Sequence, residues 1–163
     1  MNTQLKPTLL AVDLGLHSGL ALYGNDGRLR WYRSHNFGNR SRLRRGVYTI
    51  LSEIPDLCYL VMEGSGPYAA IWRKEAERRK IQVMQISAEE WRPALLLERQ
   101  QRSGAIAKAT AEQLARAVIR WSAAPTATSL DHNAAEAILI GLWGAVAVGW
   151  LAALPTAVRF ASF

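Results

Sequence analysis

The sequence has a single cysteine, Cys58, among its 163 residues. One cysteine excludes a disulfide framework and a zinc site built on cysteine ligands. Cys58 lies in a strand-like apolar run, which predicts an inert core residue. The chain also lacks internal repeats and low-complexity tracts. Its length favours a single domain over residues 1–163, with a sizeable core.

The sequence gives little indication of a signal peptide or of a membrane-spanning segment. The N-terminal MNTQLKPT lacks the apolar core of a signal peptide, so we expect a cytoplasmic protein. Residues 137–158 carry no charge and are long enough to cross a bilayer. However, Gly141, Gly144 and Pro155 interrupt this run, and no basic cluster flanks its start. We therefore favour a helix packed across a sheet, which is apolar nearly all round, over a membrane span.

Acidic residues are scarce beside basic ones, 13 against 20, and the net charge is +7. Sixteen of the basic residues are Arg and four are Lys, a bias that suits planar, bidentate recognition of phosphate. Seven of the arginines, and no acid, lie between Arg28 and Arg45. A solvated charged face is the alternative, but a same-sign run of this length more often meets an anion. The composition predicts a nucleic-acid partner.

The stretch 9–24, LLAVDLGLHSGLALYG, predicts an apolar strand, a tight turn and a second apolar strand. Asp13 ends the first strand, where a buried carboxylate is costly unless a cation or several donors meet it. Gly15 and Gly19 allow the chain to reverse close to this carboxylate. Asn-Asp-Gly at 25–27 then predicts a hairpin turn. The alternative role for Asp13 is that of a simple turn cap.

The rest of the pattern predicts alternating strands and helices. Leu29 and Trp31 are expected on one face of a third strand. Ser87 and Glu90 have the spacing of a capping box, and Asp131 is expected to cap the last helix. The predicted strands cover 8–14, 18–23, 28–35, 57–63 and 81–86; the predicted helices run from a basic loop at 36–45 to about 55, over 68–80, from 87 to about 98, over 105–121 and from 131 to 154; a polar linker covers 99–104.

Three acids stand at comparable places in this pattern. Asp13 and Glu63 each end an apolar strand, and Glu136 lies in the first turns of the last helix. Strand ends and helix starts can meet on one face of an α/β sheet. Three acids on separate elements form the arrangement that a pair of hard divalent cations needs. Each acid alone has a structural explanation, but their combination with an Arg-rich surface favours a metal site that acts on phosphate.

Four segments resemble the RuvC-type Holliday junction resolvases of the RNase H-like superfamily, and they occur in the family's order: AVDLGLHSGLALYG, YLVMEG, SGAIAKATAEQLARAVI and DHNAAEAILIGLWG. The resemblance implies an RNase H-like α/β fold, a mixed central sheet with helices on both faces. It also implies a metal-dependent, structure-selective DNA endonuclease that resolves four-way junctions as a homodimer. Asp13, Glu63 and Glu136 would then be ligands of two Mg²⁺ or Mn²⁺ ions. Lys108 would lie near the scissile phosphate.

The last helix departs from the family pattern. The family carries two acids three residues apart there, whereas Asn133 precedes Glu136 in this chain. Asn133 could bind a metal through its amide oxygen, but it brings no charge, which weakens one metal site. His132 and Asn133 can both share a helix face with Glu136. Some members of the family have a histidine in this region, so the resemblance makes His132 a candidate ligand or proton handler, with a purely structural histidine as the alternative. Asp131 is better placed as the N-cap.

DNA contacts are expected from basic residues on two helices: Arg40, Arg42, Arg44, Arg45, Arg73 and Lys74. Tyr68 follows a Gly-Ser-Gly-Pro loop where the family commonly has an apolar wedge. Tyr68 could stack on an opened base or be the first core residue of its helix. A weakly active or inactive branched-DNA-binding module is the alternative function. An actin-like or sugar-kinase ATPase needs two such domains, so we expect no nucleotide cofactor.

Overall fold

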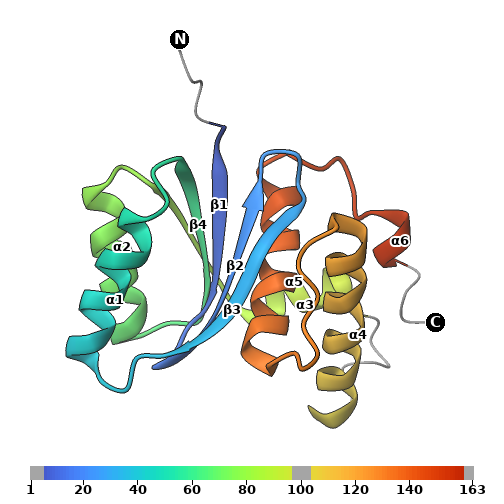
Figure 1. Cartoon of the computed structure of the whole chain (residues 1–163), viewed down its shortest axis with the longest axis horizontal. Coiled ribbons are helices and arrows are strands. Elements are labelled where there is room, and N and C mark those ends of the chain that lie inside the picture. Colours follow the sequence, from blue (N-terminus) through green and yellow to red (C-terminus); the bar gives the residue numbers. More distant parts are fainter. Residues whose placement is uncertain (1–5, 97–103, 160–163) are drawn as a thin grey trace.

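The computed structural model describes residues 6–96 and 104–159 (Figure 1). Its sheet has five strands in the order β3-β2-β1-β4-β5, with helices on both faces. β1, β2 and β3 are antiparallel, whereas β4 pairs with β1, and β5 with β4, in parallel. The elements are β1 Thr8–Asp13, β2 His17–Gly24, β3 Leu29–Asn36, α1 Arg40–Ser52, β4 Leu57–Glu63, α2 Pro67–Arg78, β5 Gln82–Ile86, α3 Ala88–Leu95, α4 Gly104–Ser122, α5 His132–Ala147 and α6 Thr156–Arg159. The mixed central sheet covered on both faces is as predicted. The predicted linker lies outside the described residues except for its last residue.

β1 lies at the centre of the core because both of its faces are covered. Leu9 and Ala11 pack in the layer formed by α3, α4 and α5, while Leu10 and Val12 pack in the layer formed by α1 and α2. All four side chains are fully buried, as a continuous apolar run predicts for a strand covered on two sides. Figure 1 shows the two helical layers on opposite sides of the sheet. Asp13 follows this buried run at the end of β1.

α5 approaches the sheet closely because glycines line its contact. A side chain at Gly19 of β2 would overlap the backbone carbonyl of Asn133, and a side chain at Gly141 would meet residues of the sheet. Gly19 is also the register partner of Asp13 in the β1–β2 pair. The first turns of α5, which carry Glu136, are therefore held against the strand ends that carry the other predicted acids.

The end of α5 differs from the prediction. Gly149 has a φ of 83°, and its N–H donates to the carbonyl of Val146 while the Trp150 N–H donates to that of Ala145. This is a Schellman motif, which satisfies the last carbonyls of the helix and reverses the chain. The predicted helix to residue 154 is wrong for this reason, because α5 ends at Ala147. Within the described ranges, no helix is long and apolar enough to span a membrane.

The opposite layer is built from larger side chains. α1 buries Leu43 and Val47, and α2 buries Trp72 and Ala76 against the other face of the sheet. The side chain of Asn39 caps α1 by accepting the N–H of Arg42 at 2.9 Å. Basic residues of both helices line one cavity between α1 and α2.

β3 places two predicted neighbours on opposite faces. Tyr23 pairs with Leu29 and Leu22 with Trp31, so a bulge skips Arg30. Leu29 consequently packs in the α5 layer and Trp31 in the α1–α2 layer. The prediction of a shared face was wrong because a bulge interrupts the two-residue alternation of a strand.

Two smaller predictions on side chains were also wrong. Cys58 is exposed rather than buried, because it follows buried Leu57 near the start of β4 and its thiol points outward, 3.6 Å from the carbonyl oxygen of Asp56. Ser87 does stand at the N-cap of α3, but its side chain forms no capping hydrogen bond with the helix. Neither change alters the arrangement of the sheet.

Candidate active site

Asp13 and Glu63 lie side by side at the sheet edge where β1 and β4 end. They are register partners in the parallel β1–β4 pair, and the N–H of Leu14 donates to the carbonyl of Glu63 at 3.2 Å just beyond them. Burial raises the pKa of Asp13 from 3.8 to about 8, and the negative charges of Glu63 and Glu136 add to the rise. Asp13 and Glu63 also share a side-chain hydrogen bond. This edge therefore concentrates carboxylates, whose effect on the pKa of Asp13 is opposed by the positive charge of Arg92.

The third carboxylate, Glu136, is 5% exposed and its two oxygens have different surroundings. Oε1 lies 3.4 Å from Nε2 of His132 and 3.5 Å from Nη2 of Arg92. Oε2 is buried and has no hydrogen-bond partner among residues 6–96 and 104–159. Burial raises the pKa of Glu136, although the charge of Arg92 opposes that rise. A buried oxygen without a partner is costly in a folded protein, and it marks a place where a ligand can bind.

Three basic side chains, those of Arg92, His132 and Lys108, face this carboxylate group. Lys108 of α4 acts on Glu136 and on His132 through its charge. The pKa of His132 is lowered, first by burial and then by Lys108, with Asp131 opposing the shift. An imidazole with a lowered pKa is largely neutral at pH 7 and can accept a proton. The strand register, the contact between His132 and Glu136 and the mutual effects of charge place Asp13, Glu63, Glu136, His132 and Lys108 in one region of the structure.

Arg92 was missed by the sequence analysis. It lies on α3, the helix that follows β5 and packs against α5. Its neighbour Trp91 is fully buried, and the Arg92 guanidinium lies 5.4 Å from the centre of the Trp91 ring. No spacing in the sequence separates this arginine from the other fifteen. Only the packing of α3 on α5 reveals that it meets Glu136.

The start of α5 fixes the remaining predicted side chains. Asp131 is the N-cap, as expected, and its Oδ1 accepts the N–H of Asn133 at 2.8 Å. The backbone carbonyl of Asn133 lies against Gly19, and its amide side chain is half-buried. Asn133 therefore contributes a neutral amide where a second acid would have added a negative charge.

The donor chemistry of this site fits a hard divalent cation, which prefers carboxylate oxygens. The buried, unpartnered Oε2 of Glu136 is the clearest sign of such a fit. As the side chains lie, no three His, Cys, Asp or Glu residues of the described chain are grouped to hold a metal ion. The other oxygen of Glu136, Oε1, contacts Arg92 and His132.

A basic groove lies between α1 and α2, with a cavity of about 460 Å³. We define the basic groove by its four cations, Arg40, Arg44, Lys74 and Arg78. The predicted DNA-binding residues are thereby divided. Arg40, Arg44 and Lys74 line the groove, whereas Arg45 lines a separate hollow with Arg33, and Arg42 is exposed near Gly38.

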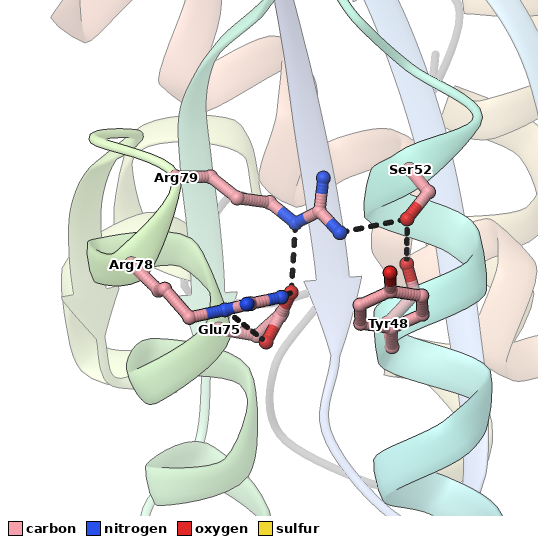
Figure 2. Close-up of polar contacts among 5 residues, drawn as sticks. All are labelled: Tyr48, Ser52, Glu75, Arg78 and Arg79. Atoms are coloured by element: carbon pink, nitrogen blue, oxygen red, sulfur yellow. Dashed lines mark hydrogen bonds and ion pairs between the residues drawn. The ribbon is translucent and has the colours of Figure 1, made fainter.

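A polar network joins the two helices beside this groove (Figure 2). Glu75 accepts from Arg78 at 2.6 Å and from Arg79 at 2.8 Å, and Arg79 also donates to the hydroxyl of Ser52 on α1 at 2.7 Å. The hydrogen bond from Arg78 is the main reason that the pKa of Glu75 is lowered. Tyr48 is 53% exposed beneath both guanidinium groups. Within the network, the hydrogen bond from Arg79 to Ser52 links the end of α2 to α1.

Two predicted DNA contacts lie elsewhere. Tyr68 is half-buried and packs against the core of the α1–α2 layer, the position expected of a first core residue of its helix. Arg73 donates to Gln85 at 3.0 Å, and Gln85 in turn donates to the carbonyl of Gly64 at 2.9 Å. Arg73 is thus tied toward the loop that follows Glu63 rather than to the basic groove.

Sequence and structure comparisons give different results. Neither the family models nor the curated proteins contain a match to this sequence. The fold belongs to the class of α/β proteins with a mixed sheet covered by helices on both faces. Among solved structures, it matches T. thermophilus RuvC in complex with a Holliday junction substrate, with a TM-score of 0.60. The match covers 87% of this chain and 95% of that chain at 15% identity. The chain therefore has the RuvC, RNase H-like fold, which confirms the predicted fold.

Proposed function

We propose that this protein is a divalent-metal-dependent endonuclease that cleaves branched DNA, with four-way junctions as its substrate. The observation that carries the proposal is the convergence of Asp13, Glu63 and Glu136, with a buried Glu136 oxygen that has no partner. The fold shared with a junction-bound RuvC supports the choice of substrate. The basic groove supports binding to a phosphate backbone.

The residues divide the chemistry of phosphodiester hydrolysis among them. Asp13, Glu63 and Glu136 would hold the metal, which when bound lowers the pKa of water and stabilises charge on phosphate. His132 accepts the proton that the attacking water loses, and Lys108 attracts the phosphate. Water forms the new bond to phosphorus while the bond to the 3′ oxygen breaks, so the products are a 5′ phosphate and a 3′ hydroxyl. Two symmetric cuts in one junction favour a homodimer.

The test is cleavage of a synthetic four-way junction beside a matched linear duplex. We expect cleavage of the junction with Mn²⁺ or Mg²⁺ and none with a chelator. Asp13→Asn should reduce the cleavage rate by about 10³-fold or more, because a metal ligand is removed, while junction binding is retained. Asp26→Asn, in the exposed β2–β3 turn, is the matched control. Equal cleavage by the Asp13 variant would disprove the assignment.

A branched-DNA-binding module without efficient catalysis is the second candidate. The observations that favour it are the neutral Asn133 and the contact of Arg92 with Glu136. Under this alternative, the wild-type protein binds junctions tightly but does not cut them. Asn133→Asp would then raise Mg²⁺-dependent cleavage, because it adds the missing negative charge.

A further inference from the structure

The two oxygens of Glu136 divide the site into two halves. On the Oε1 side, Arg92 and His132 lie within 3.5 Å. On the Oε2 side, the oxygen is buried and unpartnered. The carboxylates of Asp13 and Glu63 act on one another and on Glu136 through their charges. The Oε1 half thus already holds a guanidinium and an imidazole, whereas Oε2 has no hydrogen-bond partner among the described residues.

The balance of charge limits how many ions the site can take. Three carboxylates face Arg92 and Lys108, the two cations among the described residues that act on Glu136. A single divalent ion leaves this group with one excess positive charge, and a second ion would leave three. Asn133, three residues before Glu136, adds no negative charge to offset it. A second ion on the Oε1 side would also have to displace the Arg92 guanidinium.

We propose that Arg92 takes the place of a second metal ion, so that each chain binds one divalent cation and the Arg92 guanidinium contacts the scissile phosphate. The inference rests on the proposed function and adds to it the number of ions and a further catalytic residue. The single ion is held by Asp13, Glu63 and Oε2 of Glu136. Arg92 donates to a non-bridging phosphate oxygen, where it neutralises charge that develops during cleavage.

The position of Arg92 suits this role. Fully buried Trp91 anchors α3 at the adjacent residue, and the guanidinium lies over that ring. The Arg92 side chain is 39% exposed, so it reaches solvent while still contacting Glu136. A guanidinium has five N–H donors in a planar fork. One donor can remain toward Glu136 while others bind phosphate oxygens.

The test counts ions on the full-length protein by Mn²⁺ titration calorimetry and by the electron paramagnetic resonance of bound Mn²⁺. The wild-type protein should bind one Mn²⁺ per chain, with the spectrum of an isolated ion. Arg92→Gln should bind Mn²⁺ at least fivefold more tightly while junction cleavage at saturating Mn²⁺ falls at least tenfold. Arg92→Gln combined with Asn133→Asp should bind a second, spin-coupled ion.

Two controls separate charge from structure. Arg92→Lys keeps the cation, so it should retain one ion per chain and recover part of the cleavage rate. Arg120→Gln, on an exposed position of α4, should change neither readout. Opposite changes in metal affinity and cleavage are not expected from simple loss of structure.

The outcomes distinguish this inference from the proposed function. Two spin-coupled ions in the wild-type protein would overturn the role of Arg92 and leave the nuclease assignment standing. Unchanged Mn²⁺ affinity in Arg92→Gln would also overturn it. No Mn²⁺ binding in the wild-type protein would overturn the nuclease assignment itself, and with it the inference.

Discussion

The two helical layers of this protein contact the sheet in different ways. α5 meets the sheet through glycines, so its backbone lies against the strands and has little freedom to shift. α1 and α2 meet the sheet through large side chains such as Trp72 and carry long charged residues outside. The carboxylates belong to the strand ends and to α5, while the basic groove belongs to α1 and α2. Groups that need fixed spacing therefore lie on closely packed backbone, and groups that contact a variable ligand lie on long side chains.

The largest expected effect tests the close packing of α5. Gly19→Ala places a methyl group on the carbonyl of Asn133, and the atoms that it meets belong to the backbone of α5. We expect a loss of about 3 kcal/mol or more in the free energy of unfolding, at the upper end of overpacking costs. Cleavage should fall as well, because Gly19 is the register partner of Asp13. Urea denaturation and junction cleavage measure both effects.

The matched control for Gly19 lies in the other layer. At Gly46 of α1, a methyl group would meet the side chain of Phe37 rather than backbone. A ring can shift, and Gly→Ala within a helix recovers about 0.5–1 kcal/mol of conformational entropy. Gly46→Ala should therefore cost well under half as much as Gly19→Ala. Equal losses in the two variants would contradict the contrast between the layers.

The second prediction concerns how stability depends on pH through the buried carboxyl of Asp13, at the end of β1. In the folded protein the pKa of Asp13 is raised from 3.8 to about 8, so between those values the folded state holds a proton that the unfolded state has released. The stability contributed by this group is complete below about pH 4 and is lost as the pH rises through 8, with a slope of up to about 1.4 kcal/mol per pH unit. Thermal unfolding of the metal-free protein from pH 5 to 9 measures it.

Two variants decide whether this slope comes from Asp13. Asp13→Asn should flatten the dependence of stability on pH and should be more stable than the wild-type protein at pH 8. Asp26→Asn should keep the wild-type slope. Mn²⁺ should stabilise the wild-type protein more at pH 8 than at pH 6, because the carboxyl must lose its proton to bind the ion. Unchanged slopes in both variants would remove Asp13 as the source.

Features that follow from local sequence patterns could be predicted, whereas features that depend on how distant elements pack could not. The apolar runs ending in Asp13 and Glu63 predicted neighbouring strand ends, because alternation and strand ends follow from local patterns. Glu136 was predicted in the first turns of the last helix, and strand ends and helix starts can meet on one face of such a sheet. The resemblance to a family then implied that Glu136 is a metal ligand. Arg92 could not be found, because its meeting with Glu136 depends on how α3 packs on α5. The bulge opposite Tyr23 was missed for a similar reason, as its effect on Leu29 depends on strand pairing.

The third prediction tests whether the basic groove binds DNA. Arg40 and Arg44 line the groove, whereas Arg42 and Arg45 lie on other faces of the same helix. Arg40→Gln with Arg44→Gln should flatten the slope of log affinity against log salt by up to about 1.8, at about 0.9 for each phosphate that the protein no longer neutralises. Arg42→Gln with Arg45→Gln changes the charge equally and should flatten it less. The reverse ranking would move the DNA-binding surface off the groove.

The smallest expected effect concerns Glu75, the acid that ties Arg78 and Arg79 beside the groove. Glu75→Gln should lower the free energy of unfolding by about 0.5–1 kcal/mol, the usual range for ion pairs near the surface. Junction affinity should rise by about two- to threefold, because a negative charge is removed beside phosphate-binding cations. Glu112→Gln is the matched control, because Glu112 forms an i,i+4 pair with Arg116 on α4, far from the groove in sequence and on the other layer. It should cost similar stability without a gain in affinity, and a gain in both variants would show that overall charge, rather than the α1–α2 layer, governs binding.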